Sequence, residues 1–304
     1  MEIAFIANPT AGRGRAAAFV ERFAARATNL AIDVKWTHHP GHATALAREA
    51  KRQHCDVVCV AGGDGTVHEV VAGLMPDPIP IVVVPSGSGN DFASLIGCPV
   101  TPEALHAVLR DGMGVRFDVI DCGIRYCANS VGLGFEALVT KKSRSIKGLR
   151  GLPLYLAAVA RALVRFDSPP MRIEFDDEVL AGENLLVSIG NGVRAGGGFY
   201  LTPDALPDDG RIDVCVVERM GRLRILSLLP RAIPGRHTDA RGVSMKRARE
   251  LTVTASRPFH MHIDGEYVGE FTGPLQFRVL DRVLPVLCRA DAPARTMYPL
   301  ERIL

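Results

Sequence analysis

The sequence predicts an α/β fold with an open parallel sheet over residues 1–121, followed by a β-rich, antiparallel sandwich-like domain over residues 122–287. In the first part, short apolar runs alternate with segments whose apolar residues recur at helical spacing, which is typical of a parallel sheet covered on both faces. In the second part, runs with period-two alternation are separated by turn residues, which is typical of an antiparallel sandwich. The length of 304 residues fits two domains of ordinary size.

The first domain is expected to alternate strands with helices. Short apolar or alternating runs predict strands over residues 2–7, 32–37, 56–61 and 79–84. Helical spacing predicts helices within residues 16–27, 43–53, 67–74 and 102–109, the last with Thr101 as N-cap and Pro102 as its first residue. Strands joined through helices in this way form a parallel sheet.

The second domain is expected to contain one amphipathic helix, over residues 155–166, and a series of short strands. Alternation predicts strands over residues 171–175, 212–216, 251–255, 259–263 and 275–279. The turn signals between them include Asp264-Gly265 and Gly273-Pro274. Residues 288–304 could return to the first domain, and periodicity leaves this open.

Composition is that of a globular protein in a reducing compartment. The 36 basic and 33 acidic side chains give a formal net charge of +3, too small an excess to predict nucleic-acid binding. Seven cysteines without a CxxC pair predict buried thiols and a cytoplasmic location. No signal peptide is visible, and no apolar run approaches the roughly 20 residues that span a bilayer, so any membrane contact would be peripheral.

Three glycine-rich loops follow predicted strands of the first domain. They cover residues 8–14 (NPTAGRG), 62–66 (GGDGT) and 85–91 (PSGSGND). Because ligands of open α/β sheets bind at the carboxyl ends of the strands, we expect the three loops to converge. The alternative is that the glycines only form tight turns.

The residues in these loops are typical of a phosphate site. Glycines allow close approach of backbone N–H groups, and the helix that begins near Thr66 adds its positive end. Asp64 and Asp91 would repel a phosphate unless a divalent cation lies between, so the sequence predicts a nucleotide with Mg²⁺. Further donors are Thr10, Arg13 and Ser88.

Two other phosphate-binding motifs are alternatives to this site. The spacing Gly12-x-Gly14-x-x-Ala17 fits a dinucleotide fingerprint, which also requires an acidic residue at the end of the second strand. Thr37-His38 stand there instead. No GxxxxGK[ST] motif of a Walker P-loop is present.

The ordered set of motifs resembles the catalytic domain of the diacylglycerol kinase family, and most closely its bacterial lipid kinases. The resemblance covers nearly the whole chain. Its motifs are Asn8-Pro9-x-Ala11-Gly12, the GGDGT run with Glu69, Asn90-Asp91-Phe92-Ala93, Gly132-x-Gly134-Phe135, Gly196-Gly197-Gly198-Phe199, Pro203, Asp209-Gly210 and Asp264-Gly265-Glu266. His68 and Ser88 depart from the usual Asn and Thr, which leaves the nucleotide preference open.

The resemblance implies an active site in the cleft between the two domains, with roles for particular residues. Glu266 would be the general base, and Asp64 and Asp91 would belong to an aspartate–water network, Asp64 also being catalytic. The implied Mg²⁺ ligands are Leu206, Asp209 and Arg211, with Asp208 as an alternative to Asp209. The implied nucleotide-binding residues are Asn8, Pro9, Thr10, Ala11, Gly12, Arg13, Thr37, Gly62, Gly63, Asp64, Gly65, Thr66, Val67, His68 and Ser88.

The sequence and the resemblance together predict an ATP- and Mg²⁺-dependent lipid kinase of phospholipid metabolism. The acceptor would be diacylglycerol-like, phosphatidylglycerol-like or sphingoid. The alternatives are a kinase of soluble substrates, similar to NAD kinase, and a weakly catalytic nucleotide sensor. A basic segment (Lys141, Lys142, Arg144, Lys147 and Arg150) could touch the inner face of the cell membrane, and a homodimer is an open option.

Overall fold

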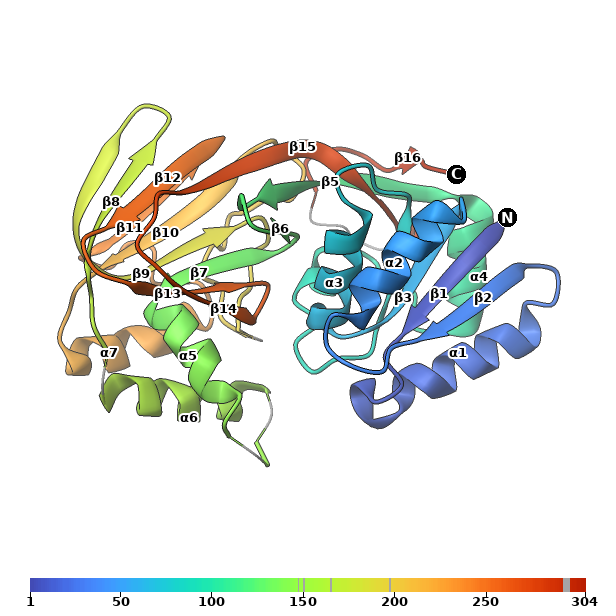
Figure 1. Cartoon of the computed structure of the whole chain (residues 1–304), viewed down its shortest axis with the longest axis horizontal. Helices are drawn as coiled ribbons and strands as arrows, with labels where there is room; N and C mark the ends of the chain where they lie inside the picture. Colours follow the sequence, from blue (N-terminus) through green and yellow to red (C-terminus); the bar gives the residue numbers. More distant parts are fainter. Residues whose placement is uncertain (147, 150, 165, 197, 292–295) are drawn as a thin grey trace. The chain divides into compact units, whose positions relative to one another are not determined.

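The computed structural model describes residues 1–146, 148–149, 151–164, 166–196, 198–291 and 296–304, which form two compact units (Figure 1). Unit 1 comprises Met1–Val119, Pro207–Asp209 and Asp281–Leu304, and unit 2 comprises Ile120–Leu206 and Gly210–Leu280. Lys147, Arg150 and Gly197 lie outside the described residues. The predicted fold class, an α/β part followed by a β-rich part, is confirmed.

Unit 1 is built on a parallel sheet with the strand order β4-β3-β1-β2. Its strands are β1 (Glu2–Ala7), β2 (Ala31–Trp36), β3 (Val57–Gly62) and β4 (Ile81–Pro85). Every residue of β3 is buried, as expected for an apolar run in a sheet covered on both faces. At the β4 edge of this sheet, Val286 and Leu287 of β15 (Leu275–Leu287) pair in parallel with β4.

Two pairs of helices cover this sheet (Figure 1). Helices α1 (Arg15–Arg26) and α4 (Pro102–Asp111) pack with Phe5 and its neighbours in one apolar cluster. Helices α2 (His42–Arg52) and α3 (Asp64–Leu74) pack against each other through Ala47 and Gly73. The Thr101 hydroxyl accepts the Ala104 N–H at 3.2 Å, so Thr101 is the N-cap that the sequence predicted.

The remaining elements of unit 1 were not predicted. They are the short helices η1 (Ala11–Arg13) and η2 (Phe92–Leu95) and the strands β5 (Met113–Asp121) and β16 (Glu301–Arg302). Strand β5 is buried along most of both faces, so its sequence lacks clean alternation. Strand β16 pairs with β5, which places the last residues of the chain in unit 1.

Unit 2 contains two antiparallel sheets that share β9 (Val179–Gly190). One has the order β14-β13-β7-β9-β10-β11, and the other continues from the first half of β9 through β8 and β12 to β15. Their inner faces meet in one cluster that includes Val187, Ile173 and Phe277. The further bounds are β6 (Tyr126–Cys127), β7 (Ser130–Gly134), β8 (Pro170–Phe175), β10 (Ile212–Glu218), β11 (Val243–Ala248), β12 (Glu250–Ala255), β13 (Phe259–Ile263) and β14 (Glu266–Phe271).

In the described part of unit 2, three helices, rather than the single one expected, pack on the outer face of the first sheet. They are α5 (Phe135–Ser143), α6 (Gly151–Val164) and α7 (Arg222–Ala232). The expected helix over residues 155–166 corresponds to α6, which begins earlier. Helix α5 starts with five buried residues and α7 contains Pro230 and exposed leucines, so neither shows a clear apolar stripe. Within the described residues, no helix is long and apolar enough to cross a bilayer.

Candidate functional site

The three glycine loops of unit 1 converge, as expected from their positions after β1, β3 and β4. A side chain at Gly12 in the first loop would overlap the Ser86 carbonyl oxygen in the third. A Cβ atom at Gly87 would lie 2.6 Å from the Cα atom of Gly63 in the second loop. Only glycine permits such approaches, so at these positions the glycines do more than close turns.

The first loop is shaped by a run of left-handed residues. Gly12, Arg13 and Gly14 all have positive φ, at 59°, 61° and 88°. The Asn8 side chain holds the start of the loop, because its Oδ1 accepts the Thr10 N–H at 3.1 Å and the Thr10 hydroxyl at 2.9 Å. The N–H groups of Ala11, Arg13 and Gly14 donate to the carbonyls of Asn8, Thr10 and Ala11 at 3.1 to 3.2 Å, so the loop is a compact turn held by its own hydrogen bonds.

The second loop leads directly into α3, whose first residue is Asp64. The helix begins at the carboxyl end of β3, so its positive end lies among the three loops. The Thr66 side chain is buried over Gly62, where any Cβ atom would meet it. Val67 and His68 are also buried, so their side chains face the protein interior.

Two carboxylates lie together where the second and third loops meet. Burial, and then the nearby charge of Asp91, raise the pKa of Asp64 to about 6. The Phe92 N–H donates to Asp64 Oδ1 at 3.3 Å, which ties the pair to η2. Asp91 is buried with 7% of its surface exposed. Two neighbouring carboxylates, one buried and one partly buried, are typical of sites that take a cation or hold a proton.

The other predicted nucleotide contacts lie in or next to these loops. Thr37 follows β2, and its N–H donates to the Ala7 carbonyl at 2.9 Å, beside the start of the first loop. Arg13 and Ser88 are exposed, so their polar groups can reach a ligand. The structure therefore gathers this set at one edge of the sheet.

Two residues of the sequence motifs turn out to support the loops. The Glu69 carboxylate accepts the N–H groups of Gly41 and Ala43 at 2.8 and 3.0 Å, and so caps the start of α2. Asn90 closes the third loop by exchanging two hydrogen bonds with Gly87, at 2.9 and 3.2 Å. Sequence reasoning did not assign either role, because both depend on backbone groups that no pattern reveals.

The expected metal ligands Leu206, Asp209 and Arg211 lie in one loop before β10. Both oxygens of the neighbouring Asp208 accept backbone N–H groups, from Met297 at 2.7 Å and Tyr298 at 2.9 Å. Burial raises the pKa of Asp208, which is fully buried. Asp208 therefore holds the last residues of the chain against this loop through two backbone N–H groups.

In unit 2, Glu266 follows a two-residue hairpin turn between β13 and β14. Asp264 and Gly265 both have positive φ, at 47° and 77°, as a type I′ turn requires. The Asp264 carboxylate accepts the N–H groups of Ala128, Asn129 and Ser130, each at 2.8 Å. The turn is thus fastened to the strand beside it. Glu266 is partly exposed, and its Oε2 atom lies 3.9 Å from Nη1 of Arg125.

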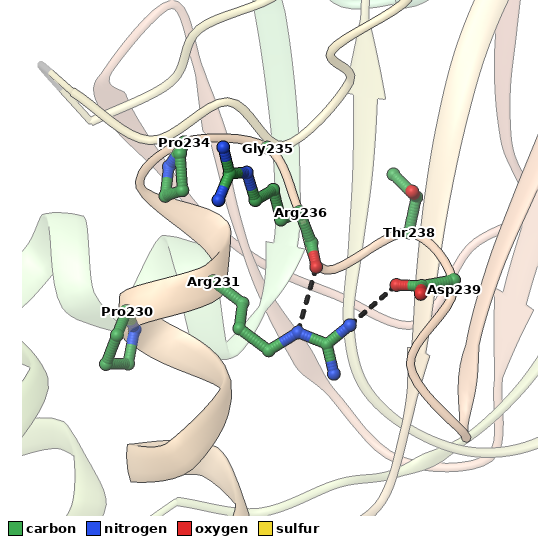
Figure 2. Close-up of a pocket in the computed structure, with 7 residues that line it drawn as sticks. All are labelled: Pro230, Arg231, Pro234, Gly235, Arg236, Thr238 and Asp239. Atoms are coloured by element: carbon green, nitrogen blue, oxygen red, sulfur yellow. Dashed lines mark hydrogen bonds and ion pairs between the residues drawn. The ribbon is translucent and has the colours of Figure 1, made fainter.

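Unit 2 also contains a pocket of about 620 Å³ at the end of α7, which holds none of the predicted site residues (Figure 2). Its Arg231 side chain donates to the Arg236 carbonyl at 2.9 Å and pairs with Asp239 at 2.6 Å. Since this guanidinium already has two partners, we assign no function to the pocket.

The first loop provides a test of the convergence. Gly12→Ala is expected to weaken ATP binding at least about tenfold, because the added Cβ would displace Ser86 in the third loop. Gly14→Ala is the matched control, since its φ is also positive but nothing lies within 4 Å of the added atom. Calorimetric titration with ATP measures both. Equal losses in the two variants would show that backbone strain, rather than loop contact, controls the site.

Two family models match this chain in succession. The diacylglycerol kinase catalytic domain matches residues 2–122, and the YegS C-terminal NAD kinase beta sandwich-like domain matches residues 129–288. A diacylglycerol kinase of Staphylococcus saprophyticus is 31% identical over 240 residues, covering 78% of this chain and 79% of that protein. A diacylglycerol kinase of Staphylococcus aureus is 30% identical over 258 residues, covering 84% of this chain and 81% of that protein.

Solved structures show the same fold. A crystal structure described as a diacylglycerol kinase of Bacillus anthracis aligns with a TM-score of 0.69 at 22% identity. A second structure from that organism aligns with a TM-score of 0.76 at 24% identity, covering 95% of this chain and 97% of the other. Fold, loops and relatives together define a kinase. The chain belongs to the diacylglycerol kinase family.

Proposed function

We propose that this chain is an ATP- and Mg²⁺-dependent lipid kinase. The observation that carries the proposal is the convergence of three glycine loops around the Asp64–Asp91 pair. Its curated relatives in two staphylococci are named diacylglycerol kinases. The transferred group would be the γ-phosphoryl of ATP and the acceptor a lipid hydroxyl, either diacylglycerol-like, phosphatidylglycerol-like or sphingoid.

Unit 1 would bind the nucleotide. The N-terminus of α3 would hold the phosphates, and the Arg13 guanidinium in the first loop would add positive charge. Residues Asn8, Pro9, Thr10, Ala11, Gly12, Thr37, Gly62, Gly63, Gly65, Thr66, Val67, His68 and Ser88 would complete the contact, several of them through the backbone. Positioning and charge neutralisation are the main requirements of phosphoryl transfer.

The loop with Leu206, Asp209 and Arg211 fits a Mg²⁺ site. Two backbone carbonyls and one carboxylate are all oxygen donors, which is the ligand type that Mg²⁺ takes. Asp64 and Asp91 would connect this site to the phosphates through a network of hydrogen bonds. When bound, the cation would supply electrostatic neutralisation of phosphate charge.

Glu266 would act as the general base. A lipid hydroxyl has a high pKa, so its attack is favoured when a carboxylate accepts its proton. Glu266 is partly exposed at the end of a rigid two-residue turn, which suits a group that must contact a substrate. Its neighbour Arg125 would keep the carboxylate oriented.

The α6–α7 surface is proposed as the peripheral membrane contact on the cytoplasmic face. It would consist of the exposed apolar side chains of the two helices, Leu156, Val164, Leu223 and Leu226, which are four of the eleven exposed large apolar side chains in the described residues. The Arg222 guanidinium donates to the Val164 carbonyl at 3.1 Å and joins the two helices. The exposed Arg161 and Arg224 add positive charge. Apolar side chains bordered by arginines fit an anionic lipid surface.

Charging this surface tests the membrane contact. The double variant Leu223→Glu/Leu226→Glu is expected to weaken binding to vesicles rich in phosphatidylglycerol by at least about tenfold, because two leucines no longer enter the bilayer. Turnover of a short-chain acceptor in solution should not change. Val179→Glu is the control, since Val179 is 47% exposed in β9, away from the two helices. Co-sedimentation measures binding, and equal loss in the control would contradict the proposal.

A kinase of soluble acceptors is the second candidate, because the matched C-terminal domain is described as NAD kinase-like. Release of ADP separates the two functions. The lipid kinase requires ADP release that depends on added lipid and Mg²⁺. ADP release with NAD and without lipid would favour the second candidate, and ATP binding without turnover would favour a nucleotide sensor.

A further inference from the structure

A buried pair of polar side chains lies next to the hairpin turn that precedes Glu266. His262, the fourth residue of β13, and Glu136, in the first turn of α5, are each about 2% exposed. His262 Nε2 and Glu136 Oε1 are 3.0 Å apart. Burying a histidine beside a carboxylate costs free energy of folding unless their hydrogen bonds are satisfied. A buried pair of this kind is therefore a candidate for a functional role.

Gly132 makes room for this pair. It lies opposite His262 in the pairing of β7 with β13. A Cβ atom at this position would overlap His262 Nε2 and would lie 2.6 Å from Glu136 Cδ. Any other residue would force the two side chains apart, so their contact requires glycine at position 132. Gly132 is also the first glycine of the Gly132-x-Gly134-Phe135 motif.

The second ring nitrogen of His262 faces the turn. The Gly265 N–H donates to His262 Nδ1 at 3.4 Å, a long hydrogen bond. A nitrogen that accepts a hydrogen bond cannot also carry a proton, so the proton of the neutral ring must be on Nε2. Nε2–H then points at Glu136 Oε1. The contact to Glu136 therefore selects the tautomer that leaves Nδ1 available to Gly265.

We propose that Glu136 and His262, with Gly132 making room, position Glu266 for proton transfer. The inference rests on the proposed function in which Glu266 is the base. Asp264 fastens one residue of the turn to the neighbouring strand, and His262 holds the other. Gly265 directly precedes Glu266, so rotation of the backbone at Gly265 would redirect the carboxylate. Displacement of a reacting group by about 1 Å can cost about 10²-fold in rate.

Two substitutions of His262 separate its two contacts. His262→Asn keeps an acceptor near Nδ1, whereas His262→Gln keeps a donor near Nε2 and loses the acceptor for Gly265. We expect kcat to fall about 10²-fold in His262→Gln and by less than about tenfold in His262→Asn. The KM for ATP should not change in either. His260→Gln is the matched control, because His260 lies on the same strand but contacts Tyr267, at 3.0 Å.

A spectroscopic measurement makes the test independent of activity. Long-range proton–nitrogen correlation spectra of the chain with labelled histidines report which ring nitrogen of His262 carries the proton, with His262→Asn assigning the signal. We expect the Nε2–H tautomer in the native chain, and the Nδ1–H tautomer would overturn the inference. If both His262 variants match His260→Gln in kcat while Glu266→Gln is inactive, the inference alone fails. If Glu266→Gln turns over at the native rate, the base assignment fails, and the inference falls with it.

Discussion

Glu266→Gln is expected to lower the rate of phosphoryl transfer to lipid by about 10³-fold, while ATP binding remains unchanged. Glutamine keeps the size and shape of the side chain but cannot accept the proton of the attacking hydroxyl. Unit 1 holds the loops proposed to bind ATP, and Glu266 belongs to unit 2, so nucleotide affinity should not respond. Single-turnover kinetics with saturating ATP measure the chemical step.

Glu270→Gln is the matched control for this experiment. Glu270 lies on the same strand, β14, and is exposed, with its carboxylate 3.3 Å from Lys141 Nζ. Breaking an exposed ion pair changes stability little. The control should therefore keep nearly native turnover. A rate in Glu266→Gln within about tenfold of the control would contradict the role of Glu266 as base.

Asp64→Asn is expected to remove activity and to stabilise the fold at neutral pH. The pKa of Asp64 is raised to about 6, first by burial and then by Asp91, so the folded state binds its proton more tightly than the unfolded chain does. Binding of this proton by Asp64 stabilises the folded state. The stabilisation is complete below the unfolded pKa of about 4 and is lost as the pH rises through about 6. At pH 7.5 the ionised carboxylate therefore destabilises the native chain, on the order of 2 kcal/mol.

Thermal unfolding at several pH values, with a chelator present, measures this effect. The Tm of Asp64→Asn should exceed that of the native chain by several degrees at pH 7.5, and the difference should shrink towards pH 4. Asp77→Asn is the control, because Asp77 follows the same helix and its side chain is 88% exposed. A difference that is independent of pH would show that Asp64 is not destabilised by its charge.

Much of the fold could be predicted because its elements show the expected periodicity. The strands of unit 1 and most strands of unit 2 are short, and their apolar residues match one or two buried faces. Helix α7 and strand β5 could not be predicted for the opposite reason. Helix α7 keeps Leu223 and Leu226 exposed, and β5 is buried on both faces, so neither has the usual pattern.

The glycine loops could be predicted as a site because each follows a strand of a parallel sheet. The supporting roles of Glu69 and Asp208 could not, because each side chain binds backbone N–H groups that are distant in sequence. The His262–Glu136 contact spans 126 residues and depends on the missing side chain of Gly132. No local pattern carries such information.

The most direct test of the lipid-kinase proposal is transfer of labelled γ-phosphate from ATP to a panel of lipids in mixed micelles with Mg²⁺. The panel contains diacylglycerol, phosphatidylglycerol and a sphingoid base, with Glu266→Gln as the inactive reference. We predict a labelled phospholipid product from one of these classes, which is absent with Glu266→Gln. No labelled lipid from any class, with ATP binding intact, would contradict the proposal and would favour a soluble acceptor or a sensor.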